Sequence, residues 1–192
     1  ITAPVGPYYV KPLHLKIETE FTRAAIGGVG SAKAAGNYGA AMYPAMLAQK
    51  EGIDQLIWTD AKEHKYLEEA GTMNMMVVIN DKLITPPLKS TILPGITRKS
   101  FLELTKEAGY EVEERAISVS EVIEAIKSGD LKELFGVGTA ATTAQVEKLT
   151  FEGNTYDLPS KESRVISNSI GQKLLRIKKG IDPDTHGWNI SV

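Results

Sequence analysis

Residues 74–85 read Asn-Met-Met-Val-Val-Ile-Asn-Asp-Lys-Leu-Ile-Thr, and this stretch decides the fold class of the chain. Five apolar residues without a charge, residues 75–79, predict a buried strand. Asn80-Asp81-Lys82 is typical of a turn, and residues 83–85 are apolar enough to return as a second strand. A hairpin at this point does not fit regular alternation of parallel strands with crossover helices, so the pattern favours an α+β (mixed α/β) fold.

Further strands and helices are expected on both sides of this hairpin. Strand-like segments lie at residues 4–10, 13–17, 55–59, 111–117 and 131–137, and a second hairpin joins 145–151 to 155–158 around Gly153-Asn154. The polar stretch 60–69 is expected to connect strands. Helical spacing of apolar residues predicts helices at 37–50, 96–108, 118–127 and 161–179.

Helix ends can be expected at particular side chains. Asn37 and Ser120 have side chains that cap helix starts, so Asn37 is a candidate cap for the helix at 37–50 and Ser120 for the helix at 118–127. Pro44 falls inside the first helical segment and should kink it or limit its first turn. On the last helix, the apolar residues recur at a spacing that predicts a buried stripe, namely Ile166, Ile170, Leu174 and Ile177.

Composition narrows the function classes. The chain has 192 residues, 42% of them hydrophobic, which is enough for one well-packed domain. A formal net charge of −2 gives no electrostatic reason to expect nucleic acid or an anionic membrane as a partner. The chain has no cysteine, which excludes disulfides and thiolate metal sites and fits a cytoplasmic protein. There is no starting Met, so the sequence reads as the interior of a longer protein.

A glycine-rich loop, Gly-Gly-Val-Gly-Ser-Ala-Lys-Ala-Ala-Gly-Asn-Tyr at residues 27–38, carries one long cationic side chain, Lys33. Small residues around it let the backbone approach a ligand closely, so the loop could present Lys33 to that ligand. It is not a phosphate-binding P-loop, which needs Gly directly before the lysine and Ser or Thr directly after it. A solvated surface lysine is the common alternative.

Two other glycine turns could face an anion or a nucleotide. Residues 136–141 half-match a dinucleotide fingerprint, but no long helix follows and that interpretation is disfavoured. Leu-Pro-Gly-Ile-Thr-Arg at 93–98 opens a helix, whose free N–H groups favour an anion such as phosphate. An ordinary helix start is an equally good interpretation. His14, His64 and His186 show no metal-ligand spacing, so surface or packing roles are expected for them.

Several short blocks, taken together and in order, resemble the branched-chain amino-acid aminotransferases, which are pyridoxal-phosphate enzymes of fold-type IV. The blocks are Pro-Val-Gly-Pro-Tyr (4–8), residues 27–38, Glu-Ala-Gly-Thr-Met-Asn (69–74), Thr-Pro-Pro-Leu (85–88), Leu-Pro-Gly-Ile-Thr-Arg (93–98), Phe-Gly-Val-Gly-Thr-Ala (135–140) and His-Gly-Trp (186–188). The resemblance implies the large domain of this fold, with β-hairpins and a mixed, barrel-like sheet surrounded by helices.

The resemblance also implies roles for the cofactor ring's neighbours. Lys33 would be the Schiff-base lysine and proton shuttle, in a dry surrounding that depresses its pKa. Tyr38 would contact the phenolate oxygen of pyridoxal 5′-phosphate, and Glu69 its ring nitrogen. Thr72 and Asn74 would line the ring's surroundings.

For the phosphate, the resemblance implies the backbone N–H groups of Ile96 and Thr97 and the hydroxyl of Thr139. The amides of Thr139 and Ala140 would face the substrate carboxylate. No metal is implied.

The family's reaction is transamination of leucine, isoleucine or valine with 2-oxoglutarate. By resemblance, residues 1–26 form an interdomain strand region, residues 27–192 form the cofactor domain, and an N-terminal small domain is missing. A homodimer is also implied. Two alternatives stay open. One is a D-amino-acid aminotransferase or aminodeoxychorismate lyase of the same fold, and the other is a catalytically silent domain.

Overall fold

The computed structural model describes residue 9 and residues 11–190 of the chain. Within these residues the helices are α1 (Ala35–Lys50), α2 (Ile96–Glu107), α3 (Val119–Ser128) and α4 (Ile166–Lys178), with a short 3₁₀ helix at Lys161–Ser163. The strands are β1 (Leu13–Ile17), β2 (Gln55–Thr59), β3 (Leu67–Ala70), β4 (Met73–Ile79), β5 (Lys82–Thr85), β6 (Val112–Glu114), β7 (Leu131–Gly138), β8 (Thr142–Phe151) and β9 (Asn154–Asp157). None of the described helices combines the length and the apolar character needed to cross a bilayer.

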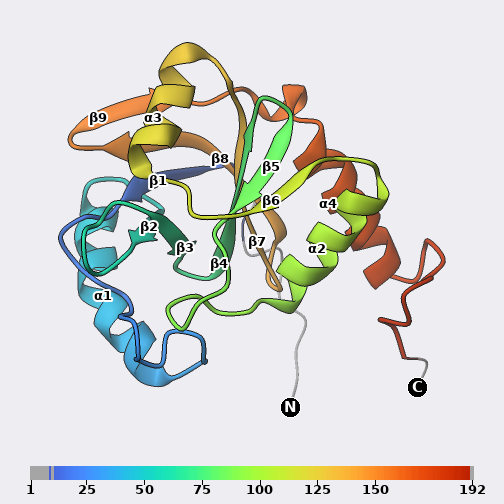
Figure 1. Cartoon of the computed structure of the whole chain (residues 1–192), viewed down its shortest axis with the longest axis horizontal. Coiled ribbons are helices and arrows are strands. Elements are labelled where there is room, and N and C mark those ends of the chain that lie inside the picture. The colour runs from blue at the N-terminus through green and yellow to red at the C-terminus, as the bar shows by residue number, and fades with distance from the viewer. Residues whose placement is uncertain (1–8, 10, 191–192) are drawn as a thin grey trace.

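Six of the strands close into a barrel (Figure 1). They pair in the order β3-β2-β1-β8-β7-β4, and β4 also pairs with β3, which closes the ring. β1 runs parallel to both of its neighbours, whereas the other barrel pairs are antiparallel. β5 and β6 extend the sheet beyond β4, and β9 pairs with β8. The α+β fold with a barrel-like sheet and surrounding helices is therefore confirmed.

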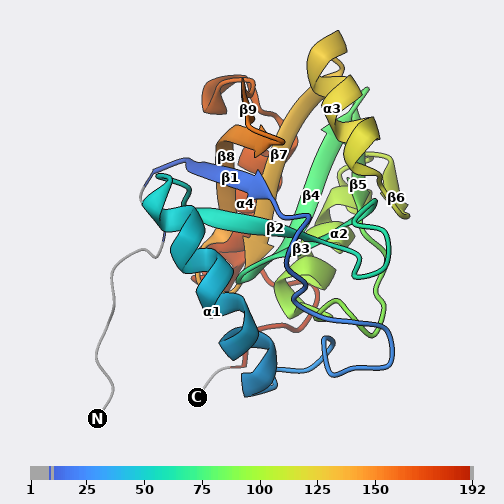
Figure 2. The ribbon, with the colours of Figure 1, turned by 90° about the vertical axis from the view of Figure 1, so that its left-hand side faces the viewer.

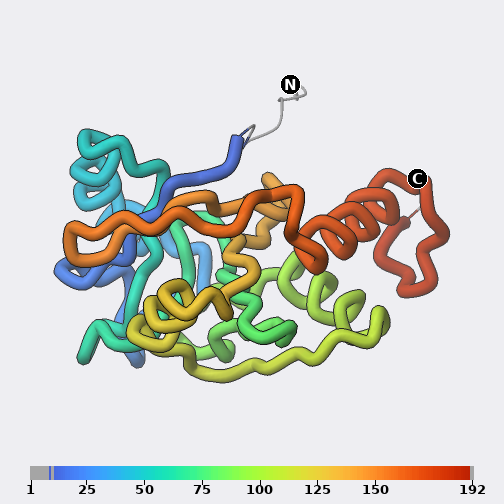
Figure 3. Tube along the Cα trace, turned by 90° about the horizontal axis from the view of Figure 1, so that it is seen from above, coloured from blue at the N-terminus to red at the C-terminus, as the bar shows by residue number. Residues whose placement is uncertain are grey.

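Residues 75–79 of strand β4 are apolar because both faces of the strand are covered. Met75 and Val77 belong to a buried cluster to which all six barrel strands contribute. Met76 and Val78 point the other way and pack with residues of α2 and α4, such as Phe101. These two helices lie side by side against one side of the sheet (Figure 3). The run 75–79 therefore reflects alternate residues entering two different cores.

Helix α1 packs on β2 at the other side of the molecule (Figure 2). Its contact with the sheet is small, through Ala48 against Leu56 and Trp58. Lys50 is the single charged residue in this helix, yet its outer side chains, including Met42 and Tyr43, are exposed. This is a solvent-facing helix without the charged face that such helices usually carry.

The predicted start of α1 is wrong. The helix begins at Ala35, two residues before the expected cap, and no side chain caps it. Asn37 is buried instead, because its side-chain amide donates to the carbonyls of Val29 (2.8 Å) and Ala32 (3.0 Å). Pro44 does not limit the first turn, since the helix continues past it to Lys50.

Two other predicted helix starts also need correction. Ser118, and not Ser120, caps α3, because its hydroxyl accepts the N–H of Glu121 at 3.0 Å. The last helix begins at Ile166 and not at residue 161. There the buried carboxylate of Glu133 accepts the first N–H groups of the helix, those of residues 165–167. The buried stripe of four apolar residues on α4 is confirmed.

The strand predictions at the two hairpins and at residues 13–17, 55–59 and 131–137 are confirmed, and the errors lie elsewhere. β3 was missed, because its Glu68-Glu69 pair makes the segment look like a surface turn. The strand expected at 111–117 is only three residues long, β6. The strand expected at 4–10 lies almost wholly outside the described residues.

Candidate cofactor site

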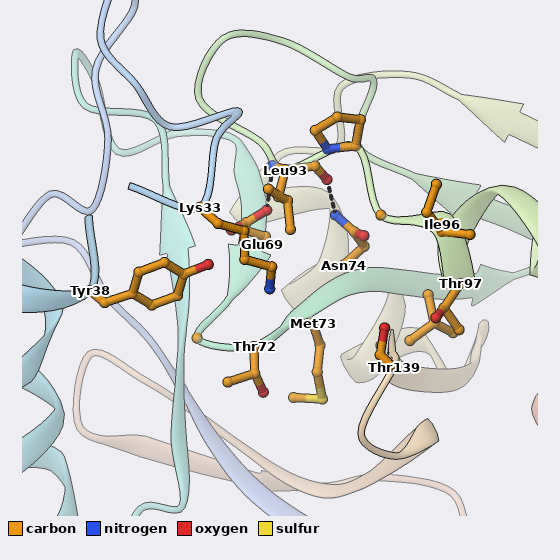
Figure 4. Close-up of a pocket in the computed structure, with 15 residues that line it drawn as sticks. Lys33, Tyr38, Glu69, Thr72, Met73, Asn74, Leu93, Ile96, Thr97 and Thr139 are labelled. Atoms are coloured by element: carbon orange, nitrogen blue, oxygen red, sulfur yellow. Dashed lines mark hydrogen bonds between the residues drawn. The ribbon is translucent and has the colours of Figure 1, made fainter. Parts of the chain in front are cut away.

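One cavity collects nearly all of the residues proposed for the site. It has a volume of about 260 Å³ and lies where the glycine-rich loop, the β3–β4 turn, the start of α2 and the β7–β8 turn meet. Figure 4 shows Lys33, Tyr38 and Glu69 on one side of this cavity, Thr97 and Thr139 on the other, and Asn74 between them. Its lining comprises Lys33, Tyr38, Glu69, Gly71, Thr72, Met73, Asn74, Leu93, Pro94, Gly95, Ile96, Thr97, Val137, Gly138 and Thr139.

The glycine-rich loop brings Lys33 to the cavity. The two hydrogen bonds from Asn37 hold this loop against the first turn of α1, so the lysine is fixed close to the helix start. Its ammonium nitrogen lies 5.9 Å from the centre of the Tyr38 ring. Lys33 is exposed, however, so the expected dry surrounding is absent from this part of the chain.

Glu69 is the buried carboxylate of the site, with 4% of its surface exposed. It lies on β3 directly opposite Asn74 of β4. One oxygen is 2.7 Å from a guanidinium nitrogen of Arg23, and the other accepts the backbone N–H of Leu93 at 2.8 Å. Burial raises the pKa of Glu69 to about 7, although the charge of Arg23 opposes that rise. Ionisation of this carboxylate is therefore finely balanced near neutral pH.

The start of α2 forms the opposite end of the cavity. No side chain among the described residues caps this helix, and its first turn has no acidic residue, so its free N–H groups are available to an anion. Asn74 fixes the approach to the helix by donating to the carbonyl of Leu93 at 2.9 Å. A Cβ on Gly95 would lie only 2.2 Å from the side-chain oxygen of Asn74, so a glycine is needed there.

The remaining predicted residues come from two turns. Thr72 and Thr139 both line the cavity, and the hydroxyl of Thr72 lies 3.0 Å from that of Tyr9. Ala140 is exposed in the β7–β8 turn and is not among the described residues that line the cavity. Its proposed contact with a substrate carboxylate stays a prediction.

Two important neighbours of the site, Arg23 and Leu93, are barely indicated by the sequence pattern. Arg23 lies in a segment that is neither helix nor strand, so no periodicity indicates that it is buried. Leu93 contributes through its backbone, which any residue type can supply. The one signal in the sequence that points to Arg23 is its position as a single arginine shortly before the glycine-rich loop.

The histidines make local contacts. His14 lies 2.8 Å from the hydroxyl of Thr150, and His64 lies 2.8 Å from that of Thr59. His186 stacks on Trp188, and its two ring nitrogens each lie 3.4 Å from a carboxylate, one of Glu103 and one of Glu107. These three residues are close enough to hold a cation, a grouping that their spacing in the sequence does not reveal.

With the barrel and this cavity in place, the chain can be compared with known proteins. A family model described as Amino-transferase class IV matches residues 3–149. The chain therefore belongs to the class IV aminotransferase family.

Within that family, the similar proteins share a narrower description. A probable branched-chain-amino-acid aminotransferase of Staphylococcus aureus (strain N315) is 44% identical over 196 residues, covering all of this chain and 55% of that protein. Branched-chain-amino-acid aminotransferase 2 of Bacillus subtilis is 41% identical, covering all of this chain and 54% of that protein. The chain thus spans about half the length of the curated relatives it matches.

Solved structures agree on the fold. The Escherichia coli branched-chain amino acid aminotransferase superimposes with a TM-score of 0.80 at 28% identity, covering 97% of this chain and 59% of that one. The enzyme of Thermoproteus uzoniensis, solved with norvaline, gives a TM-score of 0.79 at 26% identity, covering 94% and 56%. The resemblance to the fold-type IV branched-chain aminotransferases is confirmed.

Proposed function

We propose that this chain is the pyridoxal-phosphate-binding part of a branched-chain amino-acid aminotransferase. The observation that carries this proposal is the cavity itself, which brings Lys33, Glu69 and the uncapped start of α2 together from distant parts of the chain. The proposed reaction is transamination between leucine, isoleucine or valine and 2-oxoglutarate. The names of the similar proteins and the norvaline in the Thermoproteus structure support an amino-acid substrate of this kind.

The residues present fit pyridoxal phosphate. An ionised carboxylate has about four acceptor positions, and the two partners of Glu69 leave capacity for a ring N–H. The amine of Lys33 and the phenol of Tyr38 lie on the same side of the cavity (Figure 4). This arrangement suits pyridoxal phosphate, whose aldehyde and phenolate oxygen are on neighbouring ring atoms. The first turn of α2 and the hydroxyl of Thr139 offer neutral donors to a phosphate.

When bound, pyridoxal phosphate would supply an aldehyde that exchanges amino groups and a ring that withdraws electrons from the substrate α-carbon. Lys33 would attach the cofactor and then carry a proton on its amine nitrogen. Glu69 would hold the ring nitrogen in its protonated form, and Tyr38 would orient the ring through its hydroxyl. The start of α2 would bind the phosphate group at the other end of the cofactor, so that the ring keeps a fixed orientation relative to Lys33.

We further propose that this chain alone has little or no transaminase activity. Lys33 is the single cationic residue among the described residues that line the cavity, so a phosphate would lack a second positive partner. Lys33 is also exposed, which leaves one side of the site open to water. A further domain or a second subunit, as in a homodimer, would cover the uncharged outer face of α1 and complete the site. A cytoplasmic location is part of the same proposal.

Trapping of the cofactor tests the central claim. The chain is incubated with pyridoxal phosphate, reduced with borohydride, digested and analysed by mass spectrometry, and the label should be found on Lys33. Lys33→Arg should abolish this labelling. Lys65→Arg is the matched control, because Lys65 also lies near a tyrosine ring, at 5.3 Å from the centre of Tyr66, but outside the cavity. Equal labelling of wild type and Lys33→Arg would refute the proposal.

Substrate class is tested separately by half-reactions, with the further segment that the longer relatives contain supplied. L-leucine should convert the bound cofactor to its amino form faster than D-alanine or aminodeoxychorismate does. Conversion by D-alanine without conversion by L-leucine would instead identify a D-amino-acid aminotransferase.

A further inference from the structure

A buried arginine ties the carboxylate of the site to the two loops around it. Arg23 is 6% exposed, and one of its guanidinium nitrogens donates to the carbonyl of Thr91 at 2.9 Å. The other nitrogen lies 2.7 Å from Glu69 and donates, at 3.3 Å, to the carbonyl of Gly30. One side chain thus joins β3, the loop before α2 and the loop that carries Lys33.

These two loops are already in close contact at this point. The N–H of Ser31 donates to the carbonyl of Ser90 at 2.8 Å. A Cβ on Gly30 would lie within 2.8 Å of atoms of Ala24, Ser90 and Thr91, so the backbones leave no room for a side chain. Arg23 therefore occupies a fixed place, and its charge is held at one oxygen of Glu69.

The other acidic and cationic groups nearby cannot replace that charge. Glu68 is also buried, and the hydroxyl of Thr91 donates to it at 2.5 Å. This neighbouring carboxylate raises the pKa of Glu69 further, whereas Lys33 lowers it by less than Arg23 does. Without Arg23, Glu69 would be a buried carboxylate beside a second carboxylate, and its neutral form would be favoured.

We propose that Arg23 is a positioning residue that keeps Glu69 ionised and thereby decides on which atom the proton between Glu69 and the cofactor ring nitrogen lies. This inference rests on the proposed function, because it requires pyridoxal phosphate in the cavity. With Arg23 present, the pKa of Glu69 is only about 7, so the protonated cofactor ring beside it suffices to make the carboxylate negative and the proton lies on the ring nitrogen. Without it, the carboxylic acid keeps the proton and donates a hydrogen bond to a neutral ring.

The test is nitrogen NMR of the bound cofactor, using pyridoxal phosphate labelled with ¹⁵N in the ring, at saturating concentration and pH 7.5. In the wild type the signal should lie at the position of a protonated pyridine nitrogen. Glu69→Gln supplies the reference for a neutral ring. Arg23→Gln retains a donor but removes the charge, and its signal should move at least about halfway to that reference. Arg23→Lys should restore the wild-type position.

Arg164→Gln is the matched control, because Arg164 is also a buried arginine bound to backbone carbonyls but lies away from the cavity. It should lower stability and leave the nitrogen signal unchanged. If Arg23→Gln does not fold, Arg23→Met takes its place. A protonated ring in a folded Arg23→Gln or Arg23→Met protein would refute the proposal. Failure of the wild type to bind the cofactor would refute the proposed function instead.

Discussion

Replacement of Glu69 by Gln should change how the stability of the chain depends on pH. The folded carboxyl group has a pKa of about 7, whereas the ordinary value is 4.5. Between these two pH values the folded state holds a proton that the unfolded state has lost, so stability falls as the pH rises through this window. A difference of roughly 2.5 pH units, at about 1.4 kcal/mol for each, gives about 3.5 kcal/mol. Glu69 is almost fully buried, so solvent screens little of this contribution to the free energy of unfolding.

The measurement is urea unfolding of wild type and Glu69→Gln from pH 4.5 to pH 8. The free energy of unfolding of the wild type, minus that of the variant, should fall by about 3.5 kcal/mol across this range and then level off above pH 7. Glu113→Gln tests the sign when its titrations are extended below pH 4.5, because Arg115 and Lys82 lower the pKa of Glu113. The stabilising contribution of Glu113 should be constant above pH 4.5 and should be lost as the pH falls below that value. A wild-type-minus-variant difference for Glu69 that stays constant with pH would refute the reasoning.

Further substitutions test the core and the helices of the fold. Ile170→Ala on α4 should lower the free energy of unfolding by about 2–5 kcal/mol in urea titrations, because Ile170 is 3% exposed in the core under α2 and α4. Ser118→Ala should cost about 1 kcal/mol by the same assay, since it removes the cap of α3, whereas Ser120→Ala should cost less. Gly39→Ala should raise the melting temperature by an amount equivalent to roughly 0.5–1 kcal/mol, because a Cβ there meets nothing within 4 Å and alanine favours the helix. A lower melting temperature for Gly39→Ala would contradict that account of α1.

The elements that the sequence predicted correctly are those with a local cause. Residues 74–85 contain the strand, the turn and the returning strand within twelve positions, so their pairing needs no information from elsewhere. The apolar stripe on α4 and the helix that starts after Gly95 are likewise determined by residues close together in the sequence. The cap of α3 was predicted two residues too late, at Ser120 instead of Ser118. Both serines have side chains that can cap a helix, and only the path of the backbone into α3 distinguishes them.

The errors arose where a distant residue determines the local structure. α4 starts at Ile166 because Glu133 of β7 reaches its first N–H groups, and no pattern near residue 161 reveals this. β3 looked like a surface turn because its two glutamates are charged. Arg23 and Thr91, from two separate loops, are what make their burial possible.

The sequence by itself determined the hairpins, the apolar helix faces, the loop that carries Lys33 and, through its ordered blocks, the family. These depend on the spacing of residue types along the chain. The tertiary structure decided which groups meet. It placed Arg23 against Glu69, fixed the backbone of Leu93 to the same carboxylate, and set the pKa of Glu69 near 7 by burying it. Burial and charge pairing depend on distances between segments that are far apart in sequence, and these distances exist only once the barrel has closed.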